Sequence, residues 1–125
     1  MEHVIGIGGI FFKAADPNGL KAWYRDHLGV EVHPHKGVIF RAADDPGGKT
    51  VWAPFASDTT YFQPSNATFM INYRVRDMAA MLAQLAAAGV KLEGGPDPSD
   101  YGTFAWLLDP EGNKIELWQP PEPKP

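Results

Sequence analysis

The chain has no cysteine among its 125 residues. Disulfide bonds and thiolate metal sites are therefore excluded. It also lacks an apolar run of membrane-spanning length, and its N-terminus lacks the basic and then apolar pattern of a secretory signal. Its 11 basic residues are scattered and outnumbered by 15 acidic ones, which argues against a nucleic-acid partner. We therefore expect a soluble cytoplasmic protein with neither a membrane nor a nucleic-acid partner.

Two stretches of the chain, residues 9–31 and 70–92, repeat one pattern. Each reads as a strand, an Asp that caps an amphipathic helix, and a Gly that ends the helix. The two caps are Asp16 and Asp77, and the two stops are Gly29 and Gly89. One such unit is too small to bury its apolar face alone, so the repeat predicts two copies packed together.

The elements of each unit predict the order βαβββ, with the helices on one face of the sheet. The strands expected around the first helix span residues 4–14, 30–33, 37–42 and 49–55. Those expected around the second helix, residues 78–88, span residues 67–75, 90–93, 103–108 and 114–119. We predict an α+β fold in a single domain, residues 1–119, made of modules 1–56 and 67–119 with a linker at 57–66 and a proline-rich tail at 120–125.

Three segments carry a family resemblance: Gly-Ile-x-x-Ile-Phe-Phe-Lys-x-x-Asp-Pro, Leu-x-x-Trp-Tyr-Arg-Asp-x-Leu-Gly and Asp-Pro-Glu-Gly-Asn-Lys-Ile-Glu-Leu-Trp. They resemble the vicinal oxygen chelate superfamily, which includes glyoxalase I, extradiol dioxygenases, fosfomycin-resistance enzymes and the bleomycin-resistance protein. The resemblance implies a U-shaped mixed sheet of two βαβββ modules around a cleft. It also implies a homodimer as the usual assembly. It identifies the fold better than the reaction, because chemistry varies widely on this fold.

The resemblance further implies a divalent metal held by His and Glu side chains of the inner strands. The two histidine positions correspond here to Gly9 and Met70, and residues 49–56 contain no carboxylate. Only the last-strand ligand is present, as Glu116. Gly and Met offer a hard metal no useful ligand, so we expect no standard metal centre and no cofactor.

Strand alternation predicts which side chains share the cleft face. We interpret Glu116 as the candidate catalytic group, either an acid or base or a structural partner of a base such as Arg74 or Lys13. Apolar walls and a few polar groups suit a flat or amphipathic organic ligand. The candidate ligand-binding residues are Phe11, Lys13, Met70, Asn72, Arg74 and Trp118.

The remaining candidates are weaker. His33 and His35 share a strand face and form a possible metal pair, although Pro34 and the adjoining turn favour a solvated edge. Trp52, Phe55 and Phe62 are candidate aromatics of a homodimer interface, because a lone pair of modules would leave strand edges exposed. Tyr61 and Phe62 of the linker are candidates to cover the cleft.

Three functions stay open. The first is binding of a small aromatic or amphipathic molecule without the standard metal site, as in bleomycin-resistance-like proteins. The second is a metal-dependent lyase, isomerase or dioxygenase of the same superfamily. The third is a metal-free enzyme in which Glu116 moves a proton while Arg74 or Asn72 stabilises an oxyanion.

Overall fold

The computed structural model describes residues 1–33 and 37–122. The expectations for His35 and for the end of the tail, residues 123–125, lie outside the described residues. Within those residues, no helix is long and apolar enough to cross a membrane.

Both predicted helices form, and both predicted caps are confirmed. Helix α1 spans Pro17–Leu28 and helix α2 spans Met78–Ala87. The carboxylates of Asp16 and Asp77 each accept a hydrogen bond of 3.0 Å from the backbone amide three residues ahead, which satisfies a donor that the helix itself leaves free. A glycine at positive φ follows each helix, as predicted for Gly29 and Gly89.

The second half of the chain forms the predicted βαβββ unit. Its strands are β3 (Ile71–Arg74), β4 (Leu92–Ser99), β5 (Gly102–Leu108) and β6 (Lys114–Gln119). They form one sheet in the order β3-β6-β5-β4, in which β3 runs parallel to β6 and the other pairs are antiparallel. The helix between β3 and β4 provides the crossover that a parallel pair requires.

The first half forms less regular structure than its sequence predicts. It contains the short strands β1 (Val32–His33) and β2 (Gly37–Val38) and a 3₁₀ turn, η1 (Ala42–Asp44). The strands expected at residues 4–14 and 49–55 are absent from the described part of the chain. A strand needs a neighbour to pair its backbone groups, and these two segments find none. The predicted α+β fold class is nevertheless confirmed, with two helices and a mixed sheet.

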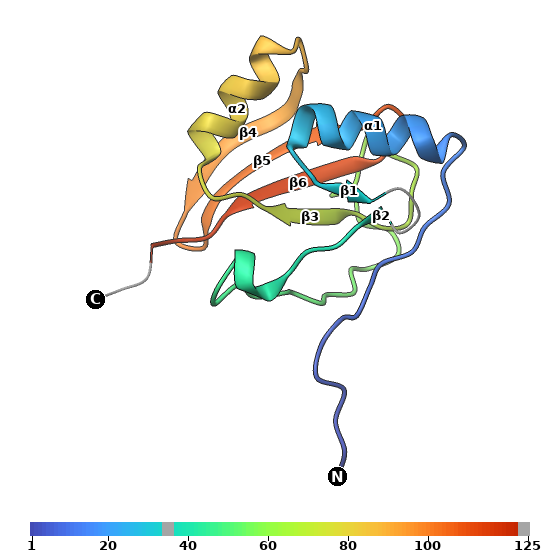
Figure 1. The fold of residues 1–125 in the computed structure, drawn as a ribbon, viewed down its shortest axis with the longest axis vertical. Coiled ribbons are helices and arrows are strands. Elements are labelled where there is room, and N and C mark those ends of the chain that lie inside the picture. Colours follow the sequence, from blue (N-terminus) through green and yellow to red (C-terminus); the bar gives the residue numbers. More distant parts are fainter. Residues whose placement is uncertain (34–36, 123–125) are drawn as a thin grey trace.

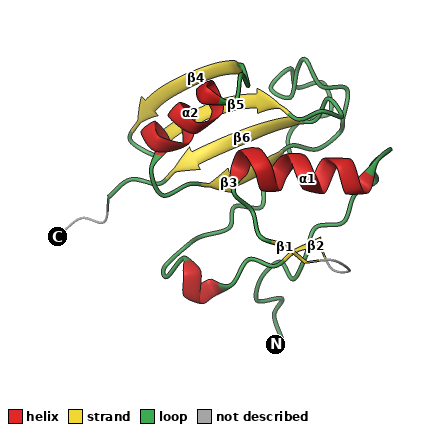
Figure 2. Ribbon diagram, turned by 45° about the horizontal axis from the view of Figure 1, so that its top comes forward, coloured by secondary structure: helices red, strands yellow, loops and turns green. Residues whose placement is uncertain are grey.

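Both helices lie on the same face of the four-stranded sheet. Figures 1 and 2 show α2 over β4 and β5, and α1 over β6 and β3. The two helices and two central strands share one core, whose largest fully buried side chains are Leu85, Leu107, Ile115 and Leu117. The helix of the first half thus completes the core of the second half.

A turn between β5 and β6 attaches α1 to the sheet. The buried carboxylate of Asp109 accepts a hydrogen bond of 2.8 Å from the Tyr24 hydroxyl. The side chain of Glu111, in the same turn, accepts hydrogen bonds of 2.6 and 2.9 Å from the backbone amides of Ala15 and Asp16. The acidic turn therefore holds the N-terminal end and the middle of α1. The pKa of Tyr24 is raised, mainly by burial and to a lesser extent by the nearby Tyr73 and the bond to Asp109.

Replacing Tyr24 with Phe tests this attachment. We expect Tyr24→Phe to lower the free energy of unfolding by about 1.5–3 kcal/mol, because a buried carboxylate loses a donor. The matched control is Tyr101→Phe, since the Tyr101 side chain is exposed and should change stability by less than about 0.5 kcal/mol. Urea denaturation measures the free energy of unfolding of both variants. Equal effects would show that the Tyr24–Asp109 bond does not hold the helix.

Candidate functional site

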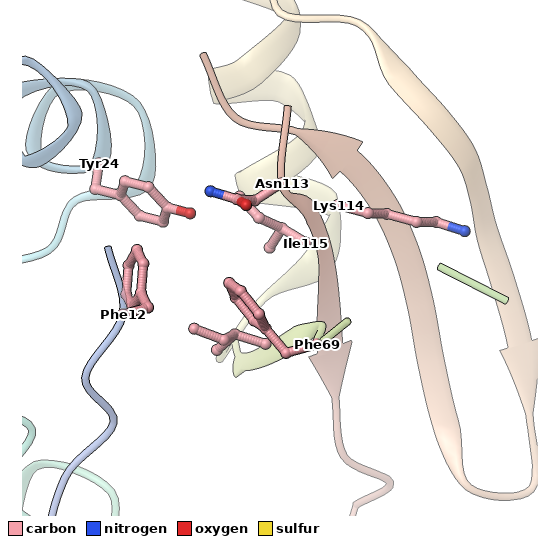
Figure 3. A pocket seen from close by; sticks show the side chains of 7 residues that line it. Phe12, Tyr24, Phe69, Asn113, Lys114 and Ile115 are labelled. Carbon is pink, nitrogen blue, oxygen red and sulfur yellow. The ribbon is translucent and has the colours of Figure 1, made fainter. Parts of the chain in front are cut away.

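The sheet has one face packed under the helices and one face without helices, which we call the open face. Figure 3 shows the alternation on β6: Ile115 points toward Tyr24 and Phe69, whereas Lys114 points to the other side of the strand. Ile115 and Leu117 are almost fully buried. The side chain of Glu116 lies between them in sequence and therefore on the open face.

Strand pairing sets two rows of side chains across the open face. In the first row, Glu116 of β6 is paired with Asn72 of β3 on one side and with Trp106 of β5 on the other. In the second row, Trp118 is paired with Arg74 and Phe104.

Glu116 is the centre of the first row. Its side chain is only 8% exposed. One carboxylate oxygen, Oε1, accepts a hydrogen bond of 2.7 Å from Asn72 Nδ2. The other, Oε2, accepts one of 2.8 Å from the Trp106 indole and one from the Tyr61 hydroxyl. A buried carboxylate is costly unless it is hydrogen-bonded, and here three donors from three separate segments satisfy it.

None of these donors is charged. The ion pairs among the described residues join Arg25 to Asp26 and Arg74 to Asp45, so Glu116 has no cation within ion-pair distance. Lys114 lies on the same face, but its ammonium donates to the backbone carbonyl of Tyr61 at 2.7 Å. That ammonium also lies 5.3 Å from the centre of the Tyr61 ring and 5.9 Å from that of Trp106.

Tyr61 reaches this site from the segment between the two halves. Burial, and then its hydrogen bond to the Glu116 carboxylate, raise the pKa of Tyr61 to about 12. The phenol therefore stays a neutral donor at physiological pH. Its ring packs against Phe62 of the same segment, against Phe55 at the end of the first half and edge-on against Trp106, so the segment covers one end of the first row.

The open face also carries three half-buried aromatic side chains, Phe104, Trp106 and Trp118. The rings of Phe104 and Trp118 are nearly parallel, 7° apart with centres separated by 6.2 Å. Those of Phe104 and Trp106 are 13° apart with centres separated by 6.4 Å. Trp118 is further held by a 2.7 Å hydrogen bond from its indole to the carbonyl of Tyr101. These rings provide aromatic surface directly beside the Glu116 carboxylate.

The structure brings some predicted site residues together and separates others. Glu116, Asn72 and Trp118 share the open face. Arg74 is in register with Trp118, but its guanidinium bonds Asp45 at 2.5 Å and the carbonyl of Lys49.

The suggested structural pairing of Glu116 with Arg74 is therefore wrong, because Arg74 pairs with Asp45 of the first half. Lys13 is not the alternative partner either, because it forms no ion pair in the described structure. Lys13 and Phe11 lie in the exposed N-terminal segment, where Phe11 is 96% exposed. Met70 is half-buried and immediately precedes β3.

Sequence reasoning missed two members of the site, Phe104 and Trp106. For the two on β5, the signal was available, because alternation from the buried Ala105 and Leu107 places both on the open face. Tyr61 was expected only as a linker residue that could cover the cleft. Its bond to Glu116 had no local signal, since Tyr61 reaches it from an irregular segment 55 positions away.

A hollow of about 320 Å³ lies away from the open face. It is formed by the start of α2 and the adjoining strand ends, and is lined by Met78, Ala79, Leu82, Pro96, Pro98, Thr103 and Gln119. No sequence-predicted site residue lines it.

The open face does not suit the metal that the family resemblance implies. Gly9 has no side chain, Met70 offers only a thioether, and both oxygens of Glu116 already accept hydrogen bonds. Among residues 1–33 and 37–122, no group of three or more His, Asp and Glu side chains is placed to hold a metal ion. We therefore derive no chemistry through a metal.

Comparison with known proteins relates this geometry to one family. Residues 9–118 match the family of glyoxalase-like domains. No curated protein matches the sequence.

Several solved structures share the fold. TnmS3, an antibiotic-binding protein from Streptomyces sp. CB03234, is 24% identical, with a TM-score of 0.54 over 86% of this chain and 88% of that one. A member of the glyoxalase/bleomycin resistance protein/dioxygenase superfamily from Sphaerobacter thermophilus is 22% identical, with a TM-score of 0.52 over 85% and 90%. A virulence protein from Salmonella typhimurium is 18% identical, with a TM-score of 0.58 over 90% and 100%.

The Tyr61–Glu116 bond predicts a coupled titration. We expect the pKa of Tyr61 to be about 12 and to fall in Glu116→Gln, although burial keeps it above the ordinary value of about 10. Folding favours the neutral phenol, so its contribution to stability is complete below pH 10 and is lost as the pH rises toward 12. A ¹³Cζ shift titration of labelled tyrosine measures the pKa, with Tyr61→Phe identifying the resonance. An unchanged pKa in Glu116→Gln would contradict the bond.

Proposed function

The chain belongs to the family of glyoxalase-like domains, and we propose that it binds a small aromatic or amphipathic molecule on the open face without a His/Glu metal site. Small-molecule sites combine aromatic surface with a few fixed polar groups. Here Phe104 and Trp118 supply nearly parallel rings, and Glu116 supplies a carboxylate whose position is set by three neutral donors. That juxtaposition is the observation that carries the proposal.

The fixed geometry of the carboxylate supports binding. Asn72, Trp106 and Tyr61 hold Glu116 from three directions, so little side-chain entropy remains to be lost when a ligand arrives. TnmS3, which shares the fold, is an antibiotic-binding protein. The fold can therefore serve a binding function, and we extend that class of function to this chain.

The absence of metal chemistry is part of the proposal. The positions that match the family's histidines are Gly9 and Met70. A metal at Glu116 would have to displace hydrogen bonds from Asn72, or from Trp106 and Tyr61. Both features favour an organic ligand over a metal-bound substrate.

A second candidate is a metal-free acid–base enzyme. The observation that favours it is the direct bond between the Tyr61 hydroxyl and Glu116, which links two groups that can exchange a proton. A binding protein returns its ligand unchanged, whereas an enzyme converts it. Mass spectrometry of a recovered ligand separates the two.

We also propose that the protein is a homodimer. All the exposed large apolar side chains except Tyr101 lie at or before residue 61. They include Trp52 and Phe55, two of the aromatics expected at an interface; Phe62 is half-buried against Phe55. The outer edge of β3 is also unpaired within the described residues. A second copy would cover these exposed apolar side chains of the first half.

Ligand binding is tested with bicyclic aromatic compounds, beginning with 3-ethylindole and quinoline. We expect a ligand to raise the melting temperature by mass action. Trp118→Ala should weaken binding roughly tenfold, because an aromatic contact is lost. The control is Trp23→Ala, since Trp23 packs beside Tyr24 and His27 on α1 and away from the open face. Equal losses in both variants would place the ligand elsewhere.

The same melting assay, repeated with equimolar zinc, nickel or manganese salts, tests for metal binding. We expect no rise in melting temperature with any of them. A transition metal bound near Glu116, located by anomalous scattering, would contradict the metal-free part of the proposal.

Light scattering at micromolar concentration tests the dimer. We expect twice the 13.7 kDa chain mass. Trp52→Glu should shift the protein toward the monomer, because it places a charge in the proposed interface. Tyr101→Glu is the matched control, since Tyr101 and Trp52 are 77% and 79% exposed but lie in different halves of the chain. A monomer mass for the unmodified protein would refute this assembly.

A further inference from the structure

We infer that the molecule bound on the open face is a cationic aromatic amine whose positive nitrogen is received by Glu116. This inference rests on the proposed binding function and specifies the chemical class of its ligand. It follows from the charge balance around one buried carboxylate.

Among the residues that the structure describes, no positive group pairs with the negative charge of Glu116. Its side chain is 8% exposed, and its three hydrogen bonds come from an amide, an indole and a phenol. Arg74, in register one row away, is bound to Asp45. A carboxylate removed from water is strongly stabilised by an opposite charge, and within residues 1–33 and 37–122 none lies at ion-pair distance.

The carboxylate has acceptor capacity left. An ionised Glu offers about four acceptor positions, and three of them are used. Oε2 receives both Trp106 and Tyr61, whereas Oε1 receives only Asn72. A ligand N–H can therefore bond Oε1 without displacing any of the three donors, and a charged donor makes the stronger bond.

The surrounding side chains also favour a cation over an anion. Asp97, paired with Phe104 across β4 and β5, adds a second negative charge near the rings. The ammonium of Lys114 already lies over the Tyr61 and Trp106 rings, which shows that these aromatic faces accept a positive group at cation–π distance. Lys114 partly offsets the two carboxylates, but its hydrogen bond goes to the Tyr61 carbonyl.

The test uses three indoles that differ in charge: tryptamine, 3-ethylindole and indole-3-propionate. At pH 7 the amine is protonated and the propionate is ionised. By calorimetry, we expect tryptamine to bind about tenfold more tightly than 3-ethylindole, because it adds a charge-assisted hydrogen bond. Indole-3-propionate should bind most weakly. This order of affinities depends on the charge of the side chain, since the indole ring is common to all three compounds.

Two variants of the carboxylate site complete the test. Glu116→Gln keeps the size of the side chain and removes its charge, so tryptamine should lose its advantage over 3-ethylindole. Tyr61→Phe keeps the ring and removes one donor from Glu116, so the preference for tryptamine should increase. Circular dichroism checks that both variants are folded. Because Tyr61→Phe leaves the carboxylate in place, it tests the inference even if Glu116→Gln fails to fold.

The outcomes separate the inference from the function on which it rests. Equal binding of the three indoles, or a tryptamine preference that persists in Glu116→Gln, overturns the inference and leaves the binding function standing. Failure of all three indoles to bind contradicts the proposed function itself, and the inference with it.

Discussion

The buried carboxylate of Asp109 is the contact on which the rest of the structure depends. It accepts the hydroxyl of Tyr24 from α1 and, through the backbone and side chain of Asn113, it shapes the turn between β5 and β6. Glu111 of that turn then receives the first amides of the helix segment. These bonds place the apolar side of α1 on a sheet built by the other half of the chain. Without that placement, the sheet would keep only one of its two covering helices.

Covering one face of the sheet leaves the other available for a site. Because side chains alternate along a strand, β6 contributes Ile115 and Leu117 to the core and Glu116 and Trp118 to the open face. One six-residue strand therefore serves both stability and binding. Packing of the core residues fixes the position and register of β6. The position of the strand then fixes where the Glu116 carboxylate lies relative to its three donors. The core beneath the open face therefore keeps the site rigid.

The features that sequence reasoning predicted correctly depend on local physics. Asp16 and Asp77 cap their helices because a short acidic side chain can reach a free amide three residues ahead. Glu116 lies beside Asn72 because two alternating strands of one sheet bring them into register. The strands expected at residues 4–14 and 49–55 were not formed, because a strand also needs a neighbour that local pattern cannot supply. Arg74 was placed correctly on its strand, but its partner, Asp45, comes from the other half.

The sequence by itself determined the α+β class, the second βαβββ unit and the presence of one carboxylate where the family resemblance implies several metal ligands. These follow from periodicity, capping and residue identity, which act over a few positions. Only the tertiary structure decided that Tyr61 completes the surroundings of Glu116, that Arg74 is bound elsewhere, and that α1 covers the sheet of the other half. Each of these contacts joins segments whose separation along the chain carries no periodic signal, so it is set by how the elements pack rather than by the pattern within any one of them.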